Sequence, residues 1–95
     1  MIPIENWARV RGRIEAVEQA DVGDHLAVHI EVSAVESVEG YPNRLHREPG
    51  DDLTVLVRRS SIGEVTPGGT LEARVRRAGL DQVYAHPEDL SVDPA

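Results

Sequence analysis

Hydrophobic and polar residues alternate in several short stretches of the chain, the pattern of strands that bury one face. The stretch 8–17 predicts a strand whose inward positions are Ala8, Val10, Ile14 and Ala16. Gly12 falls on the same inner face, and a glycine inside a strand often marks a bulge or bend where a sheet curves toward closure. The first strand therefore indicates a barrel.

A second alternating stretch follows Val22-Gly23-Asp24, which we interpret as a turn. Its inner positions are Leu26, Val28, Ile30 and Val32, and its outer positions are Ala27, His29, Glu31 and Ser33. From residue 36 to residue 52 the periodicity fails, and the prolines and glycines there predict a long loop. Long loops without secondary structure are usually functional or disordered, so this loop is either a contact surface or a mobile hairpin tip.

The second half of the chain predicts three further strands. The third has Leu53, Val55 and Val57 inside with Thr54 and Leu56 outside, and the fourth has Leu71, Ala73 and Val75 inside with Glu72, Arg74 and Arg76 outside. The segment 60–65 between them holds at most a short helix or turn. A short fifth strand, residues 82–85, is expected to end at Pro87, because proline cannot donate to a ladder. A tail packing Leu90 and Val92 should follow, poorly ordered from about residue 91.

Two segments of the chain echo each other in sequence. Segments 49–59 and 67–77 both begin with Pro-Gly and end in Val-Arg-Arg, in the same register. The echo is shorter than most solenoid units and occurs only twice. We interpret it as one turn-into-strand solution used twice.

Five strands of period two, no helix of amphipathic length and a glycine bend predict an all-β domain, residues 1–95, built as a small closed or partly open barrel. The chain resembles an OB-fold. The resemblance rests on Val10-Arg11-Gly12-Arg13-Ile14 in a long coiled first strand, on two Pro-Gly-initiated later strands and on the strand count. It covers roughly residues 7–86 and is one of pattern, without a specific family. The segment between strands three and four is too short for a full capping helix, so an SH3-like barrel is the alternative.

Composition limits the classes of function. The chain has 95 residues, no cysteine, three aromatic residues and a formal charge of -7. Without cysteine there is no disulfide framework, thiolate zinc site or cysteine nucleophile. The first residues do not form a signal peptide, and no stretch approaches the roughly 20 apolar residues of a membrane span. We therefore expect a cytoplasmic protein without a membrane partner, and the negative charge argues against indiscriminate binding to nucleic acid.

The OB resemblance implies that the first strand lies beside the fourth, which would gather outward arginines on one surface. We call this surface the arginine face; its residues are Arg9, Arg11, Arg13, Arg74 and Arg76. It suits a phosphate backbone or a partner's carboxylates. Glu15 and Glu72 lie on the same face, and cross-strand ion pairs with them are the simpler interpretation.

The long loop contributes the other candidate contacts. They are Tyr41, Asn43, Arg44, His46 and Arg47, which offer a stacking ring, amide hydrogen bonds and two guanidinium groups. Because Tyr and Arg are enriched in binding hot spots, the loop suits a protein partner as well as a nucleic acid. The outer positions of strands two and three lack the flat aromatic residues that single-stranded nucleic-acid binders use.

Metal and catalytic sites are not indicated. His25 and His29 are spaced as a helical zinc pair, but on a strand they lie roughly 13 Å apart. Asp21 and Asp24 lack the spacing of a calcium loop. Ser60-Ser61 lacks the glycines of a nucleophile elbow, and no phosphate loop is present. We expect no cofactor, no metal and no enzyme, and we interpret Trp7 as a packing lid.

These observations predict a non-enzymatic OB-like binding or assembly module. Its partner is expected to be another protein or a second copy of the chain, contacted through the 36–52 loop and the arginine face. The alternative is a single-stranded nucleic-acid-binding protein that uses the same loop and the arginines of strands one and four.

Overall fold

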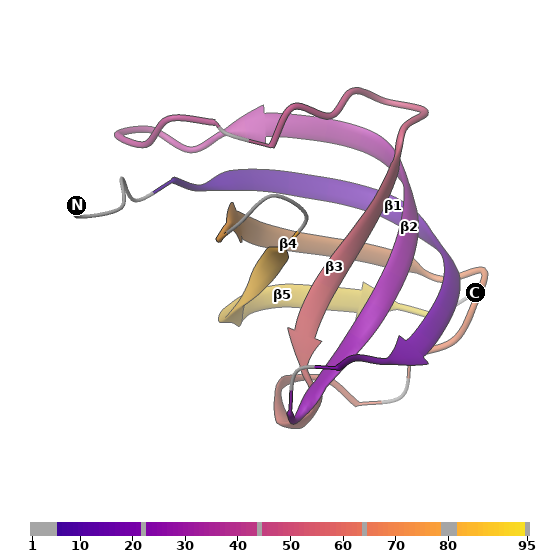
Figure 1. Ribbon diagram of the computed structural model, residues 1–95. Coiled ribbons are helices and arrows are strands. Elements are labelled where there is room, and N and C mark those ends of the chain that lie inside the picture. Colours follow the sequence, from indigo (N-terminus) through magenta and orange to yellow (C-terminus); the bar gives the residue numbers. More distant parts are fainter. Residues whose placement is uncertain (1–5, 22, 44, 64, 79–81, 95) are drawn as a thin grey trace.

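The computed structural model describes residues 6–21, 23–43, 45–63, 65–78 and 82–94. Its strands are β1 (Ala8–Gln19), β2 (His25–Ser37), β3 (Asp52–Arg58), β4 (Thr70–Arg77) and β5 (Val83–Asp93), and a single 3-10 turn, η1 (Arg59–Ser61), follows β3. The strands close in the order β1-β2-β3-β5-β4, and β4 returns to pair with β1 (Figure 1). The predicted fold class, an all-β barrel of five strands, is confirmed.

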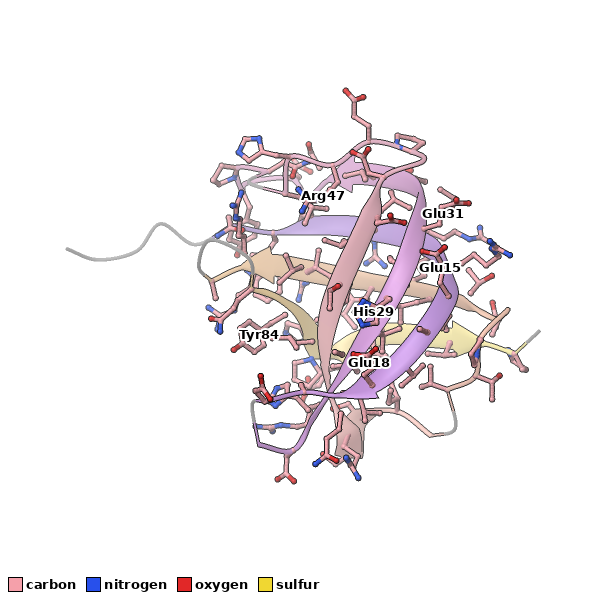
Figure 2. All side chains as sticks on the ribbon, turned by 45° about the vertical axis from the view of Figure 1, so that its right-hand side comes forward. Glu15, Glu18, His29, Glu31, Arg47 and Tyr84 are labelled. Carbon is pink, nitrogen blue, oxygen red and sulfur yellow. The ribbon has the colours of Figure 1, made fainter. Side chains whose placement is uncertain are left out.

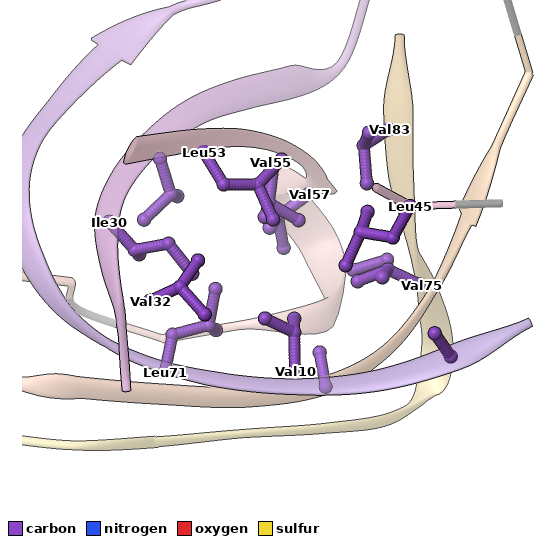
Figure 3. Packing of buried hydrophobic residues seen from close by; sticks show 14 of the residues in the cluster. Val10, Ile30, Val32, Leu45, Leu53, Val55, Val57, Leu71, Val75 and Val83 are labelled. Atoms are coloured by element: carbon purple, nitrogen blue, oxygen red, sulfur yellow. The ribbon is translucent and has the colours of Figure 1, made fainter. Parts of the chain in front are cut away.

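The barrel core consists of the inward positions of the strands (Figure 3). Inward residues of β2, β3 and β4 such as Val28, Val55 and Leu71 have no exposed surface, because alternate side chains of a closed sheet all point to its interior. Burial of each such side chain stabilises the fold by roughly 1.5–3 kcal/mol. The described chain contains no helix long and apolar enough to cross a bilayer.

Because of a bulge in β1, the side chains that point inward in its second half differ from those predicted. Ile14 pairs with Ile30 and Ala16 pairs with His29, so Glu15 is an extra residue without a partner on β2. Ala16 therefore lies opposite an outer residue, and Val17, opposite Val28, packs against the core instead. The prediction that Ala16 points inward is wrong, because an inserted residue reverses a period-two pattern beyond it.

The sequence echo corresponds to one turn used twice. Gly50 and Gly68 both have positive φ, 97° and 93°. The Gly50 amide donates to Val32 O at 2.7 Å, and the Val32 amide donates to Asp51 O at 2.8 Å. The Gly68 amide donates in the same way to Ile14 O, and the Ile14 amide donates to Gly69 O, both at 2.7 Å. The interpretation of the echo as a repeated turn is confirmed, and each turn binds the residue just before a bulge in β2 or β1.

The loop after β2 is shorter than predicted and is anchored in the core. β2 continues to Ser37, paired with β1 through Ala8, so the loop spans residues 38–51 rather than 36–52. The loop runs along the top of the barrel in Figure 1. Leu45, from the middle of the loop, is only 3 % exposed and packs near Val75 and Val83 (Figure 3). The buried Leu45 side chain fixes this part of the loop against the barrel. A freely mobile hairpin tip would lack such an anchor.

β5 is longer than predicted because it contains an irregularity that accommodates proline. Ala85 pairs with Val75 and Leu90 pairs with Ala73, so residues 86–89 stand opposite Arg74 alone. Pro87 lies in this bulge, where its missing amide costs no ladder bond. The prediction that Pro87 ends the strand is wrong. Pairing continues to Asp93 opposite Thr70, where the sequence suggested a loose tail, and Leu90 and Val92 pack against the core as expected.

Candidate functional site

The arginine face forms as the resemblance implied, since β1 and β4 pair and Arg9 lies opposite Arg74. Two of its arginines, however, are compensated by the β5 bulge. Arg9 Nη2 donates to both carboxylate oxygens of Asp89, at 3.2 and 2.9 Å, and Arg74 Nε lies 3.5 Å from Asp89 Oδ2. Arg9 Nη1 is also 3.8 Å from Glu72 Oε1. This end of the face is an internal ion-pair network.

Trp7 belongs to the same network. The Arg74 guanidinium lies 5.0 Å from the centroid of the Trp7 ring, and the Trp7 and His86 rings lie 5.3 Å apart. The preceding residue, Asn6, donates from Nδ2 to Arg77 O at 3.0 Å and accepts from the Arg77 amide at 2.9 Å. Trp7 therefore packs between β4 and the β5 bulge, in agreement with its interpretation as a lid.

The remaining residues of the arginine face, Arg11, Arg13 and Arg76, are exposed. Within the described residues none of the three has a carboxylate within 4.0 Å. Arg11 stands opposite Glu72 and Arg13 opposite Glu31 in the ladders. The five predicted arginines thus divide into a compensated pair and three solvated side chains.

The loop candidates are also divided. Tyr41 is exposed, and Asn43 Oδ1 accepts from the Leu45 amide at 3.0 Å, which makes Asn43 a turn residue. His46 is exposed with a positive φ of 54°. Arg47 donates from Nε to Asp52 O at 3.2 Å and from Nη1 to His46 O at 3.3 Å. Arg44 lies outside the described residues.

Arg47 lines a cavity that the sequence did not predict. A cavity of about 370 Å³ lies beside β3, with Leu45, Leu53 and Val83 among its apolar lining. The polar lining is supplied by Glu15, His29, Arg47, Asp52, Thr54 and Arg77. The volume is within the range of roughly 300–1,000 Å³ that ligand pockets occupy. Of the nine predicted contact residues that the structure describes, only Arg47 lines this hollow.

A second hollow of about 400 Å³ adjoins the first at His29 and Thr54, which line both. It is bounded by the end of β1, the loop after it and Gln82 before β5, and it lies over Ala27 and Leu56. We call the two hollows together the groove. In Figure 2, His29 lies in the middle of this face, with Glu15 and Glu31 on one side and Tyr84 on the other.

His29 connects three strands at the centre of the groove. Its Nδ1 is hydrogen-bonded to Thr54 Oγ1 at 2.9 Å, and its Nε2 lies 3.5 Å from Glu18 Oε2. A carboxylate, an imidazole and a hydroxyl in a row resemble the parts of a nucleophilic site. The Glu18 side chain is 69 % exposed, however, and acyl transfer also requires donors aimed at an oxyanion. His29 thus links its own strand to Thr54 on β3 and to Glu18 on β1 through its two ring nitrogens.

Carboxylates crowd the β1 side of the groove. A side-chain hydrogen bond with Asp52, with some desolvation and the negative charges of Asp52 and Glu31, raises the pKa of Glu15, and the charge of Arg13 partly opposes this. The bulge that puts Glu15 outside the β1–β2 register also brings it to this cluster. Like charges held together on a surface raise the free energy of the folded state.

The histidine pair of β2 makes separate contacts. His25 Nδ1 is 2.7 Å from Gly23 O, and its ring meets Tyr84 edge-on at a centroid distance of 5.6 Å. His29 is engaged with Thr54 instead. The described residues contain no group of three or more His, Asp or Glu side chains placed to hold a metal ion.

Sequence reasoning identified the outer positions of β2 and β3 but undervalued them because they lack aromatic residues. It missed Glu15, Leu45, Tyr84 and Gln82 as neighbours of those positions. A signal for Leu45 was present, since it is the one large aliphatic residue in the middle of a polar loop. No sequence signal places Glu15 beside Asp52.

Comparisons with protein-family models, with curated proteins and with solved structures give no significant match.

Proposed function

We propose that this protein is a non-enzymatic, OB-like binding module that holds its ligand across the outer faces of β2 and β3. The observation that carries the proposal is the groove, two adjoining hollows centred on His29 and Thr54. OB barrels bind their ligands on the face of strands two and three, between the loops after strands one and four. The groove lies at that position, and closure of β4 onto β1 supports membership of the OB superfold.

The ligand we propose is a segment of a partner protein. The groove combines an apolar lining, Leu45, Val83 and Leu56, with hydrogen-bonding side chains such as Thr54 and Gln82. An apolar centre with a polar rim is the composition of protein interfaces. Its carboxylates would repel a phosphate backbone. Together with the cysteine-free composition, this supports a cytoplasmic protein that works by contact with other proteins.

Selection from a random peptide library displayed on phage tests the proposal. The native protein should enrich peptides that Ala27→Trp no longer retains, because the indole fills the hollow that Ala27 lines. Ala34→Trp is the matched control, since Ala34 is an exposed residue of the same strand outside the groove. Failure to enrich any peptide, or equal loss in both variants, would contradict the proposal.

Single-stranded nucleic-acid binding is the second candidate, favoured by the exposed side chains of Arg11, Arg13 and Arg76. A fluorescent oligonucleotide titrated at low and moderate salt tests it, because phosphate contacts are strongest at low salt. Binding that Arg11→Gln with Arg13→Gln weakens would support this candidate. Absence of binding at low salt would remove it.

A further inference from the structure

Resting on the proposed function, we propose that the segment bound in the groove is basic, with arginine or lysine residues flanking an apolar side chain. The groove supplies a distinct recognition feature for each of these elements. The carboxylates at its two ends would receive the cationic groups, and the apolar residues that line the same hollows would receive the apolar side chain. The partner is thus defined by charge as well as by shape.

The first hollow, of about 370 Å³, offers the first cation site. Glu15 and Asp52 both line it, and the negative charges of Asp52 and Glu31 are close enough to act on Glu15. A guanidinium or ammonium group placed against these carboxylates would relieve their mutual repulsion and form charge-assisted hydrogen bonds. The cluster also belongs to a cavity of ligand size, so the ligand gains apolar contact together with charge.

The second hollow, of about 400 Å³, offers the second cation site. Glu18 and Asp21 line it, and the Glu18 side chain is largely exposed while its Oε2 faces His29. Carboxylates at both ends of the groove favour a ligand with positive charges on both sides of its centre. Ala27, opposite Glu18 in the ladder, and Leu56, opposite Ala27, line the same hollow and provide the apolar contact.

The two arginines of the groove leave its overall charge negative. Four carboxylates line the two hollows, Glu15, Asp52, Glu18 and Asp21, against the two guanidinium groups of Arg47 and Arg77. Arg47 is engaged through Nε and Nη1 with backbone carbonyl groups of its own loop and of β3. It therefore acts mainly to hold the loop on the edge of β3, and an anionic ligand would face a net negative surface.

The test uses a fluorescein-labelled peptide that repeats Arg-Leu-Arg and a matched peptide with Glu in place of each Arg. Fluorescence anisotropy should detect binding of the arginine peptide alone, and the binding should weaken as salt rises. The double variant Glu15→Gln with Asp52→Asn removes the first cation site. It should weaken binding of the arginine peptide on the order of tenfold, since each exposed ion pair contributes up to about 1 kcal/mol. Glu88→Gln, an exposed carboxylate on the β5 bulge, should bind like the native protein.

Three binding results would overturn the inference. They are equal binding of the glutamate peptide, equal affinity of the double variant and the control, and a groove-dependent set of library peptides without basic residues. The last result would leave the proposed function intact, whereas a library without groove-dependent peptides would remove the function itself. Light scattering covers one further occupant. If the native protein is a dimer and the double variant is a monomer, the arginine face of a second copy occupies the groove. That result would overturn the proposal that a segment of another protein binds there.

Discussion

The two sides of the barrel carry opposite charges and compensate them differently. On the side of β4 and the first half of β1, Arg9 and Arg74 share the carboxylate of Asp89, which the β5 bulge brings over them. On the side of β2, β3 and the second half of β1, the carboxylates of Glu15 and Asp52 line the same hollow, and the pKa of Glu15 is raised. On the basic side, Arg9 and Arg74 therefore have their counter-charge within the fold, whereas Glu15 on the acidic side has other carboxylates as neighbours.

This difference reverses the expectation drawn from charge alone. The arginine face was the more conspicuous candidate because positive charge is unusual in a chain with a formal charge of -7. A compensated ion pair has less to gain from a partner than uncompensated charges do, because its counter-charge must first be displaced. By this criterion the carboxylates of the groove are better candidates for contact than Arg9 and Arg74.

The largest effect is expected at Gly12, where β1 lies between the two sides. A Cβ atom at this position would come 2.5 Å from Glu31 O and 2.9 Å from Ile30 Cδ1. Gly12→Ala should therefore lower the free energy of unfolding by about 3 kcal/mol, the upper part of the usual range for overpacking. Urea denaturation measures this, with Gly63→Ala as control because no atom lies within 4 Å of its added Cβ. Equal stability of the two variants would show that β1 and β2 separate easily at this point.

A smaller effect is expected from Asp89→Asn, which removes the shared counter-charge of the basic side. Asp89 and Arg9 are about a third exposed, at 33 % and 39 %, so solvent screens the pair. We expect a loss of about 1 kcal/mol in the free energy of unfolding, which shrinks as salt rises. Thermal unfolding of Glu88→Gln gives the baseline for a neighbouring carboxylate. A loss of stability equal to that baseline would mean that the network contributes nothing.

The smallest effect, opposite in sign, is expected from Glu15→Gln on the acidic side. The raised pKa of Glu15 means that the folded state binds its proton more tightly than the unfolded state does. Stability should therefore fall as pH rises from the ordinary value of 4.5 through the raised pKa. The variant should melt slightly above the native protein at pH 7, and this difference should disappear in acid. Melting curves across pH measure this difference, with the exposed loop variant Glu39→Gln as reference. A lower melting temperature of Glu15→Gln than of the native protein at pH 7 would contradict the repulsion between Glu15 and its neighbouring carboxylates.

Much of the barrel was predictable from residues a few positions apart. The inner faces of β2, β3 and β4 follow from alternation, and both Pro-Gly turns occur where their sequence indicated. The errors lie where an extra residue enters a strand, at Glu15 in β1 and at residues 86–89 in β5. A bulge has no strong local signal, because its position depends on the register of the neighbouring strand.

The candidate site was much less predictable than the fold. Arg47 was named as a contact and lines the groove, but its neighbours Glu15 and Asp52 come from different strands and were assigned no joint role. The bulge at residues 86–89 brings Asp89 to Arg9 from 80 positions away. Such neighbours depend on strand pairing, which local sequence does not encode.

The sequence by itself determined the inner and outer residues of β2, β3, β4 and the first half of β1, because burial of every second side chain is a local property of a regular strand. Tertiary structure alone decided which outer residues meet. Closure placed β4 beside β1 and β3 beside β5, and two bulges then brought one carboxylate onto arginines and another onto a second carboxylate. Charge–charge energies depend on distances between strands, so the character of each face emerged only when the barrel closed.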